Sequence, residues 1–217
     1  MMKLYGINDM ARADCGGCEG CSACCRGMGD TIVLDPLDIY RLTKRLGRPF
    51  EALLENDIGL HVEEGMILPH LLMTEDNGYC VFLNEEGRCS IHEARPGLCR
   101  IFPLGRSYET GDLRYFLLEE CPKDSKRKVK IHKWLDTPEL EKNQRFLTIW
   151  HDFRKKLQEE TAVKPESSKE INLYVLKLFF VQPYDTDTDF YSQFEKRHME
   201  ACEQLKRYDG RGGEAAL

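Results

Sequence analysis

The sequence predicts an α+β protein, with a cysteine-cluster domain of short β-hairpins and helices followed by a helical C-terminal part. Three observations lead to this prediction. Short apolar segments alternate with turn residues between residues 60 and 118. Nine of the ten cysteines precede residue 122, and beyond it apolar residues recur at helical spacing. We therefore divide the chain into a cysteine-cluster metal-binding domain, 1–122, and a helical region, 123–217, packed on or beside it.

The first predicted helix has clear start and stop signals. Asp35 is suited to the N-cap, Pro36 to the first helical position, and Gly47 to the residue after the last turn. A second, short helix is expected from Phe50 to about Asp57. The first helix should bury its apolar residues, which are Leu37, Ile39, Leu42 and Leu46.

Three β-hairpins are expected in the middle of the chain, because apolar segments flank short stretches of turn residues. The turns are Glu64-Gly65, Asn84 to Gly87, and Thr110-Gly111. The paired segments are 60–62 with 66–73, 79–83 with 89–91, and 104–108 with 113–118.

The C-terminal part is predicted to be helical. Thr137-Pro138 is a start signal for a long helix that reaches about Glu160. A polar linker, 164–168, should separate it from two further helices, 170–181 and 190–208. The inward face of the long helix should contain Leu140, Phe146, Leu147, Trp150, Phe153 and Leu157.

Composition and charge limit the function classes. Hydrophobic residues make up 41% and charged residues 31% of the 217, which is typical of a globular protein. A net charge of −6 argues against general nucleic-acid binding. The N-terminus lacks the apolar segment of an export signal, and no apolar run is long enough to span a membrane, so we expect no membrane association and a cytoplasmic location. Thiols stay reduced there, which disfavours a disulfide framework.

The densest signal is a run of cysteines at the N-terminal end. Cys15, Cys18, Cys21 and Cys24 lie three residues apart, and Cys25 is adjacent. Cys15-x2-Cys18-x2-Cys21-x3-Cys25 reproduces the spacing of bacterial ferredoxin ligands. Zinc ribbons usually bring two paired knuckles, and the later cysteines are not so paired. The run therefore favours an iron–sulfur cluster, with structural zinc as the alternative.

Adjacent cysteines raise a separate question. Neighbouring side chains in an extended segment point to opposite faces, and in a turn they are still expected to diverge. We therefore predict that Cys24 and Cys25 serve different metal sites. The last cysteine, Cys202, lies in a helical stretch and is expected to be a small buried residue and not a ligand.

Several motifs together resemble the YkgJ-type CxxCxxCC cysteine-cluster family. They are Cys18-x2-Cys21-x2-Cys24-Cys25, Cys80-Val-Phe-Leu83, Cys89-Ser-Ile-His92, and Arg95-Pro-x-x-Cys99-Arg100-x-Phe-Pro103. The resemblance covers about residues 18 to 122. Its members are described as zinc- or iron-chelating proteins and are often labelled iron–sulfur oxidoreductases. It implies eight metal- or cofactor-binding cysteines: Cys18, Cys21, Cys24, Cys25, Cys80, Cys89, Cys99 and Cys121.

The resemblance leaves three functions open. The favoured one is an iron–sulfur protein with a redox or electron-transfer role and a protein redox partner. The second is a structural zinc module that binds a protein partner. The third is an enzyme that modifies protein side chains, because flagellin lysine methylases carry a similar cysteine block. Cys15 is extra to the family pattern and is either a substitute ligand or a free thiol.

Charged residues near the cysteines have two interpretations each. His92 follows Cys89 at ligand spacing, but with eight thiols available we expect it at the surface or supporting a ligand. Arg95, Arg100 and Arg106 are either solvated or compensate anionic clusters. The basic segment 123–133 is read as a solvated strand face, with docking of an acidic partner as the alternative.

One acidic motif is not taken as a metal site. Asp185-x-Asp187-x-Asp189 begins like a calcium-binding loop. Phe190 stands where that loop needs glycine, and Lys196 where it needs a bidentate glutamate. We therefore do not predict calcium binding.

Overall fold

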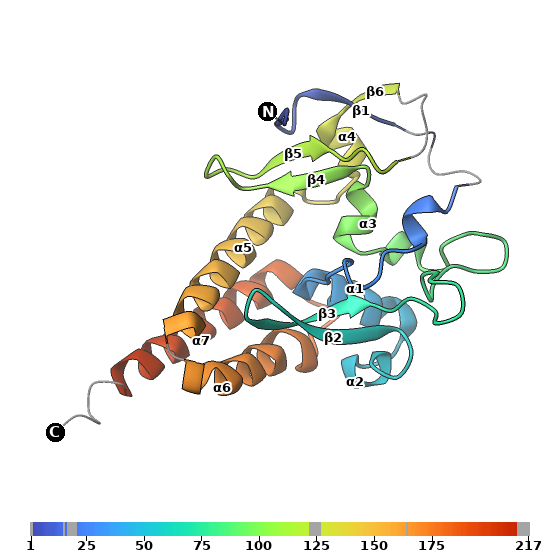
Figure 1. Ribbon diagram of the computed structural model, residues 1–217. Coiled ribbons are helices and arrows are strands. Elements are labelled where there is room, and N and C mark those ends of the chain that lie inside the picture. Colours follow the sequence, from blue (N-terminus) through green and yellow to red (C-terminus); the bar gives the residue numbers. More distant parts are fainter. Residues whose placement is uncertain (1, 15, 17–20, 122–126, 164, 212–217) are drawn as a thin grey trace.

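A computed structural model describes residues 2–14, 16, 21–121, 127–163 and 165–211. Short antiparallel strand pairs and helices alternate up to residue 135, and long helices make up the rest, which confirms the α+β class and the helical C-terminal part. Figure 1 shows α5, α6 and α7 with the β2–β3 hairpin at one end, and β1, β6, β4 and β5 at the other. None of the described helices is long and apolar enough to cross a bilayer.

Helix α1, Pro36–Leu46, forms as its sequence signals predict. The Asp35 carboxylate accepts a hydrogen bond from the Asp38 backbone at 2.9 Å, and the Asp38 carboxylate accepts one from the Asp35 backbone at 3.2 Å. This reciprocal capping box satisfies amides that a helix start leaves unpaired. Gly47 ends the helix with a φ of 64°, a conformation that glycine adopts without steric cost. The short helix α2, Phe50–Leu53, follows but stops before Asp57.

Two of the three predicted hairpins are present. Strand β2, Ile58–Glu63, pairs with β3, Met66–Leu71, and strand β4, Leu104–Ser107, pairs with β5, Arg114–Leu117. The middle hairpin is wrong as a strand pair: its turn is present, but only an isolated bridge joins Leu83 to Cys89. A third pair joins β1, Met10–Asp14, to β6, Arg127–Lys130, whose side chains are mostly exposed as expected of a solvated strand.

Two short helices lie between these strands. Helix α3, Gly97–Ile101, precedes β4, and helix α4, Ile131–Leu135, follows β6 directly. The Trp134 indole donates to the carbonyl of Ile101 at 3.0 Å and so links the two helices. Neither helix is predicted by the sequence patterns above, because each is only five residues long.

The C-terminal helices differ from their predicted bounds in two places. Helix α5, Leu140–Val163, starts two residues after Pro138, because Glu139 has a φ of 52° that interrupts the helix. Helix α6, Pro165–Leu176, occupies most of the expected linker, since Pro165 is well suited to a first helical position. It continues as the π-helical turn η3, Lys177–Val181, and α7, Phe190–Arg211, ends the described chain.

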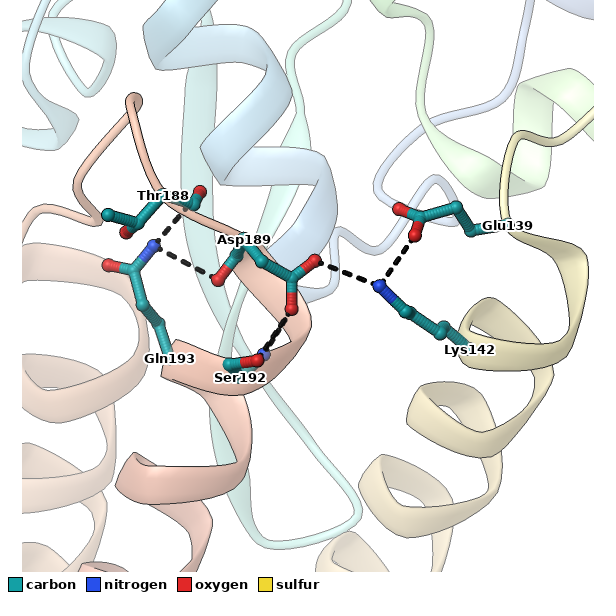
Figure 2. A network of polar contacts seen from close by, with 6 residues as sticks. All are labelled: Glu139, Lys142, Thr188, Asp189, Ser192 and Gln193. Atoms are coloured by element: carbon teal, nitrogen blue, oxygen red, sulfur yellow. Dashed lines mark hydrogen bonds and ion pairs between the residues drawn. The ribbon is translucent and has the colours of Figure 1, made fainter.

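The rejected calcium motif has a structural role at the start of α7. The Asp189 carboxylate accepts hydrogen bonds from the backbone and hydroxyl of Ser192, at 2.8 and 2.7 Å (Figure 2). Lys142 of α5 lies between Asp189, at 3.5 Å, and Glu139, at 2.5 Å. The motif therefore caps α7 and ties it to the start of α5.

Two hydrophobic clusters hold the fold together. The larger one joins α1, α2 and the β2–β3 hairpin to aromatic residues of α5, η3 and α7, among them Phe146, Trp150, Phe179 and Phe194. The smaller one combines residues of β1, α3, β4 and β5 with Ile131 and Leu135. Both clusters draw residues from 1–122 and from 123–217, so the two predicted parts share their cores. The division at residue 122 stays a prediction.

Candidate metal centre

Five cysteine side chains line one cavity of about 310 Å³. They come from two blocks of sequence that are more than sixty residues apart, and the fold brings them together. Arginines and the Trp134 indole complete its wall. The lining cysteines are Cys21, Cys24, Cys25, Cys89 and Cys99.

The first cysteine block is fixed to the middle of the chain by backbone hydrogen bonds. Cys24 and Cys25 lie on the 3-10 turn η1, Ala23–Cys25. The amide of Cys80 donates to the carbonyl of Cys25 at 2.8 Å, and the Gly27 amide donates to Gly78 at 2.8 Å. Next to these bonds, the Arg26 guanidinium stacks on the Tyr79 ring at 4.2 Å. The first block and Cys80 therefore form one unit without needing a regular sheet.

A tight loop presents Cys89. The Asn84 amide donates to the Arg88 carbonyl at 2.9 Å, and the Arg88 amide donates to the Asn84 side chain at 2.7 Å. Gly87 has a φ of 70°, which other residues rarely adopt. The loop turns the chain back so that Cys89 bridges Leu83 and faces the cavity.

Helix α3 presents Cys99, and a buried carboxylate holds the start of that helix. Asp38 of α1 is 2% exposed, and its Oδ1 atom accepts a hydrogen bond from the Gly97 amide at 2.7 Å. Close packing adds to the constraint, because a Cβ at Gly97 would lie 2.7 Å from the Arg106 guanidinium. Asp38 thus joins the capping box of α1 to the segment that carries Cys99.

Backbone amides point at two of the sulfur atoms. The amide of Phe82 donates to Cys80 and the amide of Ile91 donates to Cys89, and both bonds lower the pKa of the thiol that accepts them. Each bond spans two residues, as in the turns that commonly surround thiolate ligands. Such N–H···S bonds stabilise the thiolate form that binds metals.

Burial nevertheless keeps these thiols protonated in the metal-free protein. It is the main cause that raises the pKa of Cys80, Cys89 and Cys99. For Cys24 the hydrogen bond with Cys25 is the first cause and burial the second. A bound cation would replace these protons, so metal affinity must rise with pH.

Arginine side chains offset part of the charge that thiolates would carry. Arg95 and Arg100 line the cavity, and the charge of Arg95 lowers the pKa of both Cys24 and Cys89. The Nε atoms of both arginines are buried without a hydrogen-bond partner among the described residues. This burial argues against the fully solvated alternative for Arg95 and Arg100, and compensation of an anionic centre stays a prediction.

The two remaining candidates, Arg106 and His92, differ in their position relative to the cavity. Arg106 does not line the cysteine cavity, and its charge acts on the partly buried Asp35 carboxylate. His92, on the short turn η2, His92–Ala94, is exposed, and its Nε2 atom lies 2.7 Å from Arg95. It therefore supports the cavity wall at the surface, as expected.

The expected divergence of the two adjacent thiols is wrong. The Cys25 side chain is the first cause that raises the pKa of Cys24, so the two thiols lie near each other, and both line the same cavity. The reason is the 3-10 turn, which keeps consecutive side chains nearer than an extended segment would. The assignment of the two cysteines to different metal sites therefore loses its geometric support.

The other predicted ligands have different surroundings. Cys80 is buried, and its charge raises the pKa of Cys99. Cys80 therefore lies beside the five cysteines that line the cavity. Cys121 is buried but is not part of the cavity wall. Cys15 and Cys18 lie outside the described residues. Cys202 is partly buried on α7, 3.5 Å from His198, and packs against the large core.

The cysteine group surrounds a space and does not converge on one point. Among the described residues, no three His, Cys, Asp or Glu side chains lie close enough to hold a single ion as they stand. Sulfur is the commonest donor on the cavity wall, which also includes His92 and Asp136, and a sulfur-rich donor set suits soft or borderline metals and iron–sulfur clusters. The contribution of Asp38 could not be read from the sequence, because its bond to Gly97 is a tertiary contact.

Comparison with known proteins gives one match. Residues 17–116, just under half of the chain, match the CxxCxxCC family, described as "Putative zinc- or iron-chelating domain". This confirms the family resemblance that the cysteine spacing predicts, and it supports metal binding. No curated protein and no solved structure matched the chain.

Proposed function

Starting from this match of residues 17–116 to a chelating domain, we propose that the cysteine cavity holds an iron–sulfur cluster with a redox or electron-transfer role. One observation carries the proposal. Thiols from η1, the Cys89 loop and α3 line a single cavity of about 310 Å³. A lone zinc ion needs its four ligands at about 2.3 Å from one point, whereas a cluster occupies a larger volume between its thiolates.

The surroundings of the thiols support the same proposal. When bound, such a cluster would accept and release one electron at a time. The amides of Phe82 and Ile91 and the guanidinium of Arg95 place positive charge beside the sulfur atoms. Hydrogen bonds and nearby charge of this kind stabilise the more negative, reduced state and raise the reduction potential. The electrons would pass to a protein redox partner at the open side of the cavity.

The proposed ligands are the cysteines of the family pattern. Those seen around the cavity, with Cys80 beside it, supply more thiols than one four-ligand cluster requires. Cys18 and Cys121 remain proposed ligands on the resemblance alone. The exact set is therefore a question for substitution of single residues.

The decisive measurement is metal analysis after anaerobic purification. We expect iron with a matching amount of acid-labile sulfide, and a broad visible absorption that reduction bleaches. Cys99→Ser should lower both the iron content and the melting temperature, because binding free energy at such a site is also folding free energy. Cys202→Ser is the matched control and should retain both. Stoichiometric zinc without iron, from cells supplied with iron, would refute the cluster and leave a structural zinc module.

A further inference from the structure

A second hollow, of about 1170 Å³, opens next to the cysteine cavity and is strongly basic. Six Lys and Arg residues line it, against only two carboxylates, Glu93 and Asp136. The whole chain carries a net charge of −6, so this local excess of positive charge is opposite in sign to the charge of the protein as a whole. The six cations are Arg41, Lys44, Arg45, Arg95, Arg100 and Lys133.

These cations form no direct ion pair within the described part of the chain, although the Asp35 and Asp38 carboxylates act electrostatically on Arg41, and Asp136 acts on Arg100. None of the six forms an ion pair with any described Asp or Glu residue. Their contacts are neutral: Lys44 donates to the carbonyl of Thr186 at 3.1 Å, and Arg100 donates to that of Glu93 at 2.7 Å. Like charges gathered in one hollow repel each other unless an anion lies between them.

The fold, and not chance exposure, assembles the hollow. Arg41, Lys44 and Arg45 are spaced three and four residues apart, so they share one face of α1. Arg95 precedes α3, Arg100 lies in its last turn, and Lys133 lies on α4. Walls from separate elements make a concave site, as small-molecule sites are, whereas a nucleic-acid surface is more often an extended stripe.

We propose that this hollow binds a small molecule carrying a doubly charged oxyanion group, a phosphate or a pair of carboxylates. The planar fork of arginine suits both groups, because it donates two parallel hydrogen bonds to paired oxygens. The hollow and the cysteine cavity share five lining residues, so a bound anion would lie beside the metal centre; they are His92, Arg95, Arg100, Lys133 and Asp136. The proposal does not depend on which metal occupies that centre.

Calorimetric titration of the purified, metal-loaded protein with inorganic phosphate and, separately, with succinate tests the proposal and distinguishes the two anion sources. We expect saturable binding of at least one probe. The double variant Arg41→Gln/Arg45→Gln should weaken it by about tenfold or more, since charge-assisted hydrogen bonds are lost. These two residues lie on α1, away from the cysteines. Lys133→Gln is a second variant should the double variant fold poorly.

The matched control is Lys155→Gln/Lys196→Gln, which removes two exposed cations on α5 and α7 with the same change in net charge. It should leave the affinity within about twofold. The proposal would be overturned if neither probe bound the wild-type protein saturably. It would also be overturned if the Arg41→Gln/Arg45→Gln variant and the control lost the same affinity for the probe. Displacement of the probe by a single-stranded oligonucleotide that binds more tightly would overturn it in favour of a nucleic-acid surface.

Discussion

Replacing Asp38 by alanine should destabilise the segment that carries Cys99, and the loss should depend on pH. The Asp38 carboxylate accepts the Gly97 amide at 2.7 Å and the Asp35 amide at 3.2 Å, and it is buried. Removing it leaves the Gly97 amide without an acceptor, which costs about 1 to 3 kcal/mol. Losing the return bond of the capping box costs about 0.5 to 1 kcal/mol more. Together these costs lower the free energy of unfolding of Asp38→Ala by roughly 3 kcal/mol relative to the wild type, at a pH where the wild-type Asp38 carboxyl is neutral.

The pH dependence follows from the raised pKa of this carboxyl. Burial, and then the neighbouring Asp35 carboxylate, raise the pKa of Asp38 from 3.8 to about 7. The folded protein therefore binds the proton more tightly than the unfolded chain between these values. Wild-type stability should consequently rise as the pH falls from 7 toward 4, and the full cost of the buried charge should be present above pH 7. Asp38→Ala removes this dependence, so its deficit should be largest near pH 5 and smaller near pH 8.

Urea unfolding of both proteins, followed by circular dichroism at several pH values from 5 to 8, measures the difference directly. The pH dependence of the thiols cancels in that comparison, because both proteins retain them. Asp38→Asn keeps an acceptor for the Gly97 amide and should be at least as stable as the wild type at pH 8. Asp152→Ala, on the exposed side of α5, is the control and should change stability by less than about 0.5 kcal/mol. A deficit for Asp38→Ala below 1 kcal/mol at pH 5, or one equal at pH 5 and 8, would refute the reasoning.

Three further predictions concern the metal and the packing around it. Arg95→Gln removes a positive charge that lowers the pKa of Cys24 and Cys89, so the variant should take up metal only at a higher pH than the wild type does. An unchanged profile of metal uptake against pH would mean that Arg95 does not act on the thiols. Removing the metal with a chelator should lower the melting temperature by several degrees, and adding iron and sulfide back should restore it. Gly105→Ala should lower the free energy of unfolding by about 2 kcal/mol or more, because the new Cβ would lie 2.3 Å from the Phe116 ring. Thermal unfolding measures this loss, and a variant as stable as the wild type would show that the ring moves freely.

Local signals predicted much of the fold. The capping residues of α1 and the turns of the β2–β3 and β4–β5 hairpins act within a few residues, so the sequence alone reveals them. The inward face of α5 is also correct for five of its six residues, with only Leu140 partly exposed. These features depend on periodicity and on residues with special backbone preferences.

Features that depend on tertiary contacts escaped prediction. The segment around Cys80 and Cys89 has strand-like composition, but backbone bonds to Cys25 and a tight loop hold it as isolated bridges. Pro165 suits a helix start as well as a linker, and packing of α6 on β3 and α5 decides between them. The cysteine ligand candidates could be named from the spacing of the first block and from the family resemblance, whereas the Asp38–Gly97 bond could not be predicted, since 59 residues separate its partners.

The shared core has a consequence for how the protein is made. The ribosome releases the N-terminal cysteines first, but the large cluster that supports their loops includes Phe194 and Leu205. At roughly 5 to 20 residues per second, the thiols wait on the order of ten seconds or more for those residues to emerge. During that interval the nascent chain exposes reactive sulfur with no cavity to protect it. Metal loading of the cysteine cavity would therefore follow the emergence of α7, and truncation within that helix would leave the cysteines intact in sequence yet unsupported.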